Sequence, residues 1–172
     1  RLEGTSRILE PREQGIRFSC QLSDTIEFEG VRARCYGVDD RLSEVIYRQE
    51  ARFDAGGFED LVSLSRGPDP VPVHREAKES SITSDRVILH PDVGRIALSS
   101  AQAHRLSVRR GEDVLLTVHR GRTVRKKRFE VVAILRLLPG FRRIRGRDRW
   151  VSGAGVLLSD REFGAGQLFD RE

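Results

Sequence analysis

Alternating apolar and polar residues predict where the ordered part of the chain begins. Between Ile16 and Leu22 every second residue is apolar, and a similar alternation returns between Val31 and Val38. A period of two places apolar side chains on one face of a β-strand, so we expect an antiparallel meander in this part of the chain. Residues 1–15 are polar and show no period, and we expect a flexible lead-in there.

Three other stretches have the features of short helices. Apolar residues recur at helical spacing between Phe58 and Leu64, and the following Gly67-Pro68 pair cannot continue a helix. Short polar residues, which accept hydrogen bonds from the unpaired amides of a first turn, precede two more stretches. We therefore expect helices over residues 41–48, capped by Asp39 or Asp40, over residues 58–66, and over residues 100–105, capped by Ser99 or Ser100.

The second half of the chain predicts a hairpin with one long strand. A strand over Val114–His119 is followed by Gly121, which suits the tip of a turn, and then by a return strand over Thr123–Leu137. Val131–Leu135 is apolar at consecutive positions, which indicates a strand covered on both faces. We also expect short strands over Val87–Leu89, Ile96–Leu98 and Gly155–Ser159, a short helix over Asp160–Phe163, and a polar surface excursion over residues 74–86.

These elements predict an α+β fold with mixed and antiparallel sheets and short helices. The 172 residues suffice for one medium domain or two small ones. We expect two small lobes, residues 16–98 and 99–163, and a tail over residues 164–172. No apolar run approaches the roughly 20 residues that cross a bilayer as a helix.

Charge is distributed unevenly along the chain. Residues 1–100 carry 14 basic and 18 acidic side chains, a net charge of −4, whereas residues 101–172 carry 17 and 8, a net charge of +9. The second half can therefore attract anions. Its most concentrated basic segment is a predicted loop whose arginines lie beside Phe141 and Trp150. The candidate anion or partner contacts are Arg142, Arg143, Arg145, Arg147, Arg149 and Trp150. We interpret the run Arg125–Arg128 as the solvated end of a hairpin strand.

No motif in the sequence predicts catalysis. The four histidines are isolated, and the sequence lacks a Gly-x-Ser-x-Gly elbow, a phosphate-binding P-loop and a dinucleotide-binding fingerprint. We therefore expect neither a metal site nor a cofactor. Cys20 and Cys35 both lie on apolar strand faces, and two alternatives are open for them, a disulfide or two buried thiols.

Several segments, taken in order, resemble the extracytoplasmic domain of an FtsX-like (MacB-like) ABC transporter permease. A helix, a turn before an apolar strand, a hairpin and a final strand succeed one another as in that family. The matching segments are Arg95–Val118, Arg128–Leu135, Leu138–Phe141, Gly155–Ser159 and Phe163, preceded by Cys35–Asp39, Phe53–Leu61 and Val71–Val73. The resemblance covers roughly residues 31–163.

The resemblance implies a non-catalytic domain on the extracytoplasmic side of a bacterial membrane. Such a domain lies between two membrane helices, and a separate cytoplasmic ATPase subunit drives its movement. The implied role is to couple that movement to the handling of a lipid, a peptide or an envelope protein. The resemblance implies no active site in this chain and no nucleic-acid partner.

Two alternatives come from other classes of protein. The basic second half suits a module that binds nucleic acid or another acidic polymer. The segment Ser99–Val118 also resembles the helix and following strand of molybdopterin dinucleotide-binding domains, which are accessory barrels of enzymes. Those domains lack the long apolar strand over Phe129–Leu137 in this order, so we rank this alternative third.

Overall fold

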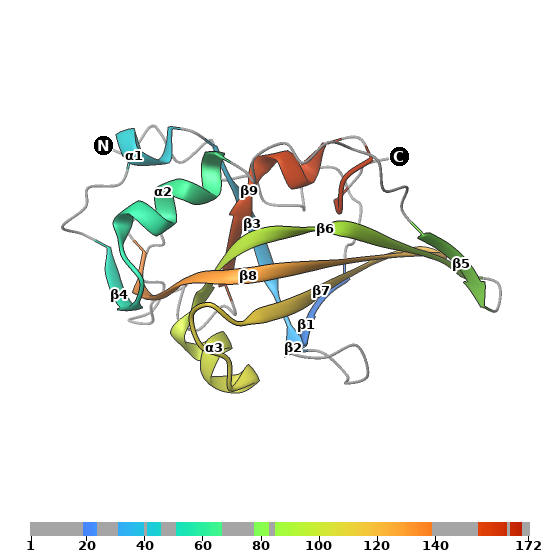
Figure 1. The fold of residues 1–172 in the computed structure, drawn as a ribbon, viewed down its shortest axis with the longest axis horizontal. Coiled ribbons are helices and arrows are strands. Elements are labelled where there is room, and N and C mark those ends of the chain that lie inside the picture. The colour runs from blue at the N-terminus through green and yellow to red at the C-terminus, as the bar shows by residue number, and fades with distance from the viewer. Residues whose placement is uncertain are drawn as a thin grey trace, which may run out of the picture.

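A computed structural model describes most of the chain in thirteen elements (Figure 1). The described residues are 19–23, 31–39, 41–45, 51–66, 78–82, 85–138, 155–164 and 166–169. The strands are β1 (Ser19–Ser23), β2 (Val31–Arg32), β3 (Arg34–Val38), β4 (Arg52–Ala55), β5 (Lys78–Ile82), β6 (Asp85–Ser99), β7 (Asp113–Arg120), β8 (Thr123–Leu137) and β9 (Gly155–Ser159). The helices are α1 (Leu42–Val45), α2 (Phe58–Arg66), α3 (Ser100–Leu106) and the 3₁₀ helix η2 (Asp160–Phe163).

The fold is α+β, with the described strands joined in one mixed, curled sheet. The strand order is β2-β1-β7-β8-β6-β9-β3, with β4 paired to β8 and β5 paired to β6. The pairs β6–β8 and β3–β9 are parallel, and β7–β8 is an antiparallel hairpin. Only Ala33 separates β2 from β3, so both ends of this strand path belong to one short stretch of chain. The sheet therefore curls into a half-barrel.

The long strands β6 and β8 run side by side across the molecule (Figure 1). Two irregularities interrupt their pairing. Residues 90–92 of β6 lie opposite Lys127 alone, and Val132 of β8 is an extra residue between two paired neighbours. An extra residue in one strand shifts the alternation of side chains. Accordingly, Val131 belongs to the cluster inside the sheet, whereas Ala133 belongs to the cluster outside it.

Apolar side chains are buried on both faces of the central strands. The inner cluster includes Ile96, Leu98, Leu116, Phe129 and Val156, which come from four neighbouring strands. The outer cluster places Leu61 and Leu64 of α2 against Ala97, Ala133, Leu135 and Leu157 of β6, β8 and β9. This arrangement confirms that Val131–Leu135 is part of a strand covered on both faces.

Helix α3 begins where its sequence predicts and ends one residue later, at Leu106. The side chain of Ser99, the N-cap residue, accepts a hydrogen bond from the backbone N–H of Gln102. Ser107 ends the helix in the left-handed conformation, with φ 54°, and its N–H donates to the carbonyl of His104. No helix within the described ranges is long and apolar enough to cross a membrane.

Several predictions from the sequence need correction. Strands from residues 16–98 and 99–163 alternate within the one sheet, so these segments do not form two separate lobes. The predicted polar excursion over residues 74–86 contains β5 and the start of β6, because β5 pairs with β6 along all five of its residues. Strand β3 leaves the predicted meander and pairs with β9 in parallel.

Candidate functional site

The described chain begins and ends beside the turn of the β7–β8 hairpin. The first described residue, Ser19, pairs with His119 near the end of β7. On the neighbouring strand, the guanidinium of Arg125 donates to the backbone carbonyl of Gln167 over 2.7 Å. His119 itself lies opposite Val124 of β8. We call this part of the molecule the hairpin end, and it is where the first and last described segments come together.

A buried ion cluster lies on the inner side of the sheet near the hairpin end. The side chain of Lys127 is 1% exposed, and its ammonium lies 2.7 Å from Glu162 Oε1 and 2.5 Å from Asp92 Oδ2. The same ammonium lies 5.7 Å from the centre of the Phe129 ring, within range of a cation–π contact. The partners come from β8, η2 and β6. We call Lys127, Asp92, Glu162 and His90 the Lys127 cluster.

Burial shifts the titration of two members of the Lys127 cluster. Removal from water raises the pKa of the Glu162 carboxyl above its ordinary value, while the nearby Lys127 charge opposes that shift. Removal from water and the Lys127 charge lower the pKa of His90. Glu162 Oε2 and His90 Nε2 are buried atoms with no hydrogen-bond partner in the described part of the chain. The cluster therefore buries charge that is only partly compensated.

The Lys127 cluster fastens the C-terminal described segment to the sheet. Glu162 lies in η2, and the backbone N–H of Phe169 donates to the Glu162 carbonyl over 2.9 Å. The rings of Phe163 and Phe169 are stacked, with centroids 4.5 Å apart, and both belong to the inner core. Gly37 of β3 gives the Phe163 ring room, because a Cβ there would lie 2.7 Å from it. Charge and ring packing thus hold the same segment.

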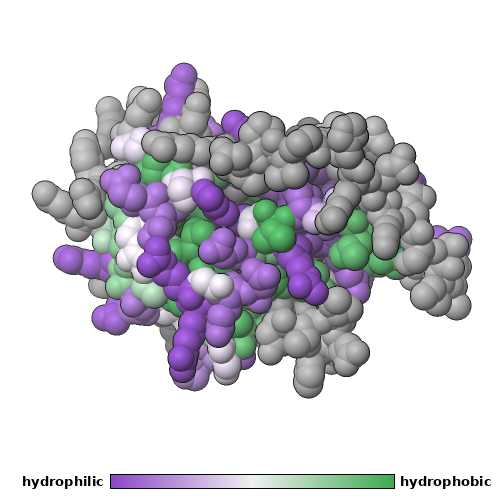
Figure 2. Space-filling model, in the orientation of Figure 1, coloured by the Kyte–Doolittle hydropathy of each residue, from purple (hydrophilic) through white to green (hydrophobic). Residues whose placement is uncertain are grey.

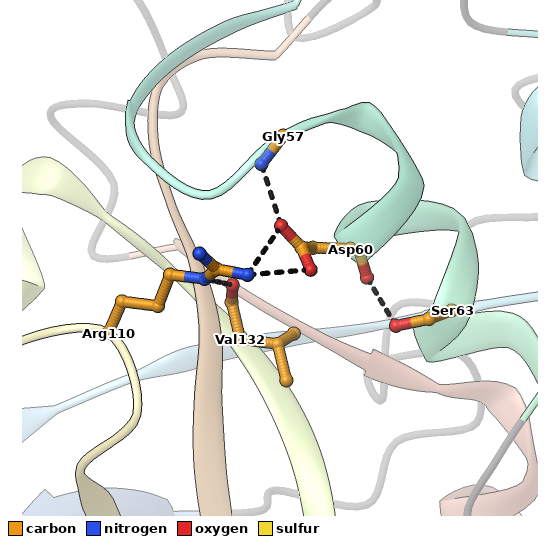
Figure 3. A network of polar contacts seen from close by, with 5 residues as sticks. All are labelled: Gly57, Asp60, Ser63, Arg110 and Val132. Carbon is orange, nitrogen blue, oxygen red and sulfur yellow. Dashed lines mark hydrogen bonds and ion pairs between the residues drawn. The ribbon is translucent and has the colours of Figure 1, made fainter.

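A second polar network ties α2 to the bulge of β8 (Figure 3). The Asp60 carboxylate accepts from the backbone N–H of Gly57, the N-cap position, over 2.8 Å. The two oxygens of the Asp60 carboxylate also accept from the terminal nitrogen of Arg110, over 3.0 and 3.1 Å. Arg110 Nε donates to the Val132 carbonyl over 2.9 Å. This network is half-exposed and connects α2, the turn before β7, and β8. We interpret it as a structural clamp between these parts of the fold.

A third polar group lies where β4 meets α3. The Asp54 carboxylate accepts from the Ser100 hydroxyl and from Arg136 of β8. The hydrogen bond from Ser100 is the largest cause that lowers the pKa of Asp54; burial opposes it, and the hydrogen bond and charge of Arg136 lower the pKa further. Each group has a partner, and Asp54 has an exposed arginine beside it. The arrangement ties the edge strand β4 to the start of α3 and to β8.

The predicted basic contacts lie outside the described residues. This applies to Arg142, Arg143, Arg145, Arg147, Arg149 and Trp150. The side chain of Cys20 also lies outside them, while Cys35 is 2% exposed and carries a thiol. Cys35 belongs to β3, which pairs with β9, whereas the strand of Cys20 pairs with β2 and β7. Of the two alternatives, a disulfide or buried thiols, the structure therefore shows a buried thiol for Cys35.

Sequence reasoning missed the Lys127 cluster. We interpreted Arg125–Arg128 as a solvated strand end, and this is wrong for Lys127, which is among the most buried side chains. A signal was present, since Lys127 shares the strand face of Phe129 and Val131, which are buried. Nothing near Glu162 in the sequence indicates that it would approach Lys127, because the two residues are 35 positions apart.

Neither a metal centre nor a known relative identifies the site. Within the ranges that the structure describes, no group of three or more His, Cys, Asp or Glu side chains is placed to hold a metal ion. Comparison with protein families, curated proteins and solved structures found no match to this chain. Any functional conclusion therefore depends on the residues and on the geometry described above.

Proposed function

We propose that this chain is a non-catalytic extracytoplasmic domain of an ABC transporter permease, of the FtsX-like (MacB-like) kind. In this role it couples the movement of membrane helices, driven by a separate cytoplasmic ATPase subunit, to the handling of a lipid, a peptide or an envelope protein. The observation that supports the proposal is that α3 packs against the sheet and that the resembling strands are neighbours in the order β7-β8-β6-β9.

The segments that carry the resemblance form one structural unit. They include α3 and parts of β6, β7, β8 and β9, and these four strands are successive neighbours in the order β7-β8-β6-β9. Sequence pieces that are scattered by chance have no reason to assemble in this way. Their contiguity supports the view that their order along the chain reflects a common core.

The hairpin end is also where the fold can receive a mechanical displacement. The Lys127 cluster joins the segment that leaves the sheet to both β6 and β8. These two strands pair in parallel from Arg86 and Thr123 to Ser99 and Leu135, so they span the domain. A displacement applied at the hairpin end is thereby passed to the whole sheet rather than absorbed at its edge.

Purification of the full-length gene product from membranes tests the proposal. We expect the product to need detergent for extraction, to carry hydrophobic spans of about 20 residues on both sides of this chain, and to copurify with a subunit that hydrolyses ATP. A product that is extracted without detergent and has no ATPase partner contradicts the proposal. So does turnover of a substrate by this chain alone.

A second candidate is the accessory barrel domain of a molybdopterin enzyme. The curl of the sheet favours it, because α3 and β7 carry the resemblance and lie within the half-barrel. Strand β8 extends over Phe129–Leu137, the feature that those domains lack in this order. This candidate predicts a gene product without membrane spans that copurifies with a molybdopterin-containing enzyme.

A further inference from the structure

The outer face of the sheet at the hairpin end carries exposed aliphatic residues between cations. Leu89 and Val93 of β6 are 40% and 47% exposed, and they are the large hydrophobic residues most exposed in the described chain. Leu89 lies opposite Lys126 of β8, and Val93 lies opposite Arg128. Arg122 is exposed at the turn itself. We call Val87, Leu89, Val93, Val124, Arg122, Lys126 and Arg128 the outer ridge.

Strand register places the members of the outer ridge on one face, except Arg122, which lies in the turn. Val87 and Leu89 are paired with Val124 and Lys126, and residues two apart in a strand share a face. Lys127, between Lys126 and Arg128, turns inward and is buried. The outer ridge therefore places the aliphatic side chains of β6 beside Val124, Lys126 and Arg128 of β8. Figure 2 shows hydrophobic residues in small patches among hydrophilic ones on one face of the molecule, without identifying the ridge.

We propose that the outer ridge contacts the headgroup layer of an anionic phospholipid membrane. This inference rests on the proposed function, which places the domain beside a bilayer. Lys and Arg side chains attract anionic headgroups, and aliphatic side chains between them enter the boundary of the acyl region. The ridge joins both kinds of side chain at the hairpin end.

The chemistry of the outer ridge favours lipid over nucleic acid. Proteins that bind single-stranded nucleic acid stack bases on aromatic side chains beside a basic groove. The apolar members of the ridge are Val87, Leu89, Val93 and Val124, all of them aliphatic. Pro91, between Leu89 and Val93, is also exposed and aliphatic. Aliphatic groups gain little from a base but leave water favourably in the lipid interface.

Co-sedimentation of the 172-residue chain with lipid vesicles tests the inference. Vesicles of phosphatidylcholine with and without phosphatidylglycerol are compared at low ionic strength. Each cation near an anionic surface strengthens partitioning about fivefold, so the variant Arg122→Gln/Lys126→Gln/Arg128→Gln should bind about a hundredfold more weakly than the parent chain. The variant Leu89→Ser/Val93→Ser should bind about tenfold more weakly.

A matched control removes three exposed arginines from other parts of the fold. Arg41 precedes α1, and Arg105 and Arg109 lie in and after α3. The variant Arg41→Gln/Arg105→Gln/Arg109→Gln has the same net charge as the ridge variant and should bind within about threefold of the parent. Thermal unfolding checks that all variants fold, as expected for changes at exposed or half-exposed positions.

Four results would overturn the inference. The first is no binding of the parent chain to anionic vesicles. The second is equal weakening by the ridge and control variants, which would indicate net charge alone. The third is unchanged binding of the ridge variant to anionic vesicles, together with loss of vesicle binding in a variant that carries Ser at positions Arg142, Arg143, Arg145, Arg147 and Arg149. The fourth is binding of single-stranded DNA or RNA tighter than vesicles and lost in the ridge variant. In each case copurification with an ATPase would leave the proposed function standing.

Discussion

Replacement of Lys127 by Met tests whether the buried ion cluster holds the C-terminal segment. Met keeps an unbranched side chain of similar length beside Phe129 and removes the positive charge. Asp92 is 39% exposed and can be solvated again, whereas Glu162 is 5% exposed and cannot. Removing one partner of a buried pair costs about 3–5 kcal/mol. We expect a loss of about 3 kcal/mol in the free energy of unfolding at neutral pH, assigned mainly to Glu162.

The pH dependence of that loss identifies its cause. The folded-state pKa of Glu162 is already raised above its ordinary value of 4.5, and removal of the Lys127 charge should raise it further. A raised folded pKa means that the folded state binds a proton where the unfolded state does not. Stability then increases as pH falls through the raised pKa toward 4.5. The deficit of Lys127→Met should therefore shrink on acidification.

Urea denaturation at about pH 7.5 and about pH 5.5 measures both effects. The double variant Lys127→Met/Glu162→Gln removes both charges and should recover about 2 kcal/mol of the loss. Asp92→Asn should cost less than Glu162→Gln, because Asp92 is the more exposed partner. A loss below about 1 kcal/mol for Lys127→Met, or an equal loss at both pH values, would refute the reasoning.

Three other predictions follow from single contacts. Gly94→Ala should lower the free energy of unfolding by about 2 kcal/mol in urea denaturation, because the added Cβ would lie 2.5 Å from the Phe129 ring. Gly57→Ala, whose added Cβ would have nothing within 4 Å, should cost less than about 1 kcal/mol. Equal losses in the two variants would contradict this expectation. Asp60→Ala should lower stability more than Arg110→Ala, because Asp60 also caps α2. Each substitution should cost no more than about 2 kcal/mol. The reverse order of the two losses would be inconsistent with the structural role of this network. The folded-state pKa of His90 is lowered, so the free energy of unfolding should fall as pH drops below 6.5. His90→Gln should lose part of this dependence of stability on pH. An unchanged dependence would show that His90 does not titrate in this range.

Patterns of local origin were predicted well from the sequence. The strands over Thr123–Leu137 and Gly155–Ser159 and the helical turn over Asp160–Phe163 have the bounds that the sequence predicts. The cap at Ser99 was also predicted, and its side chain bonds within the first turn. In each case a local pattern marks the element, because the cap of α3 bonds within one turn and the apolar positions of each strand follow one another along the chain.

Pairings between distant segments were not predicted. The two short strands expected over Val87–Leu89 and Ile96–Leu98 are one strand, because pairing with β8 continues past the irregular residues 90–92. The edge strand β4 was missed, since its alternation extends over only four residues and their pairing partners are more than 75 positions away. Helix α1 covers Leu42–Val45 within the expected residues 41–48, and residues 46–48 lie outside the described residues.

The candidate site was the hardest part to predict. The sequence directed attention to the arginine-rich loop, which lies outside the described residues. The structure instead draws attention to Lys127 and Glu162, two charges that composition and spacing treat as solvated. Burial of such charges depends on where β6, β8 and η2 meet, and that juxtaposition is a property of the assembled sheet.

Labelling of the full-length protein in intact cells tests the central claim most directly. A cysteine at the exposed position Arg105 is treated with a membrane-impermeant maleimide, and the parent protein, whose Cys35 is 2% exposed, is the control. An extracytoplasmic domain should be labelled at Arg105→Cys in intact cells as fully as in permeabilised cells. Labelling that occurs only after permeabilisation would place the domain on the other side of the membrane and contradict the account.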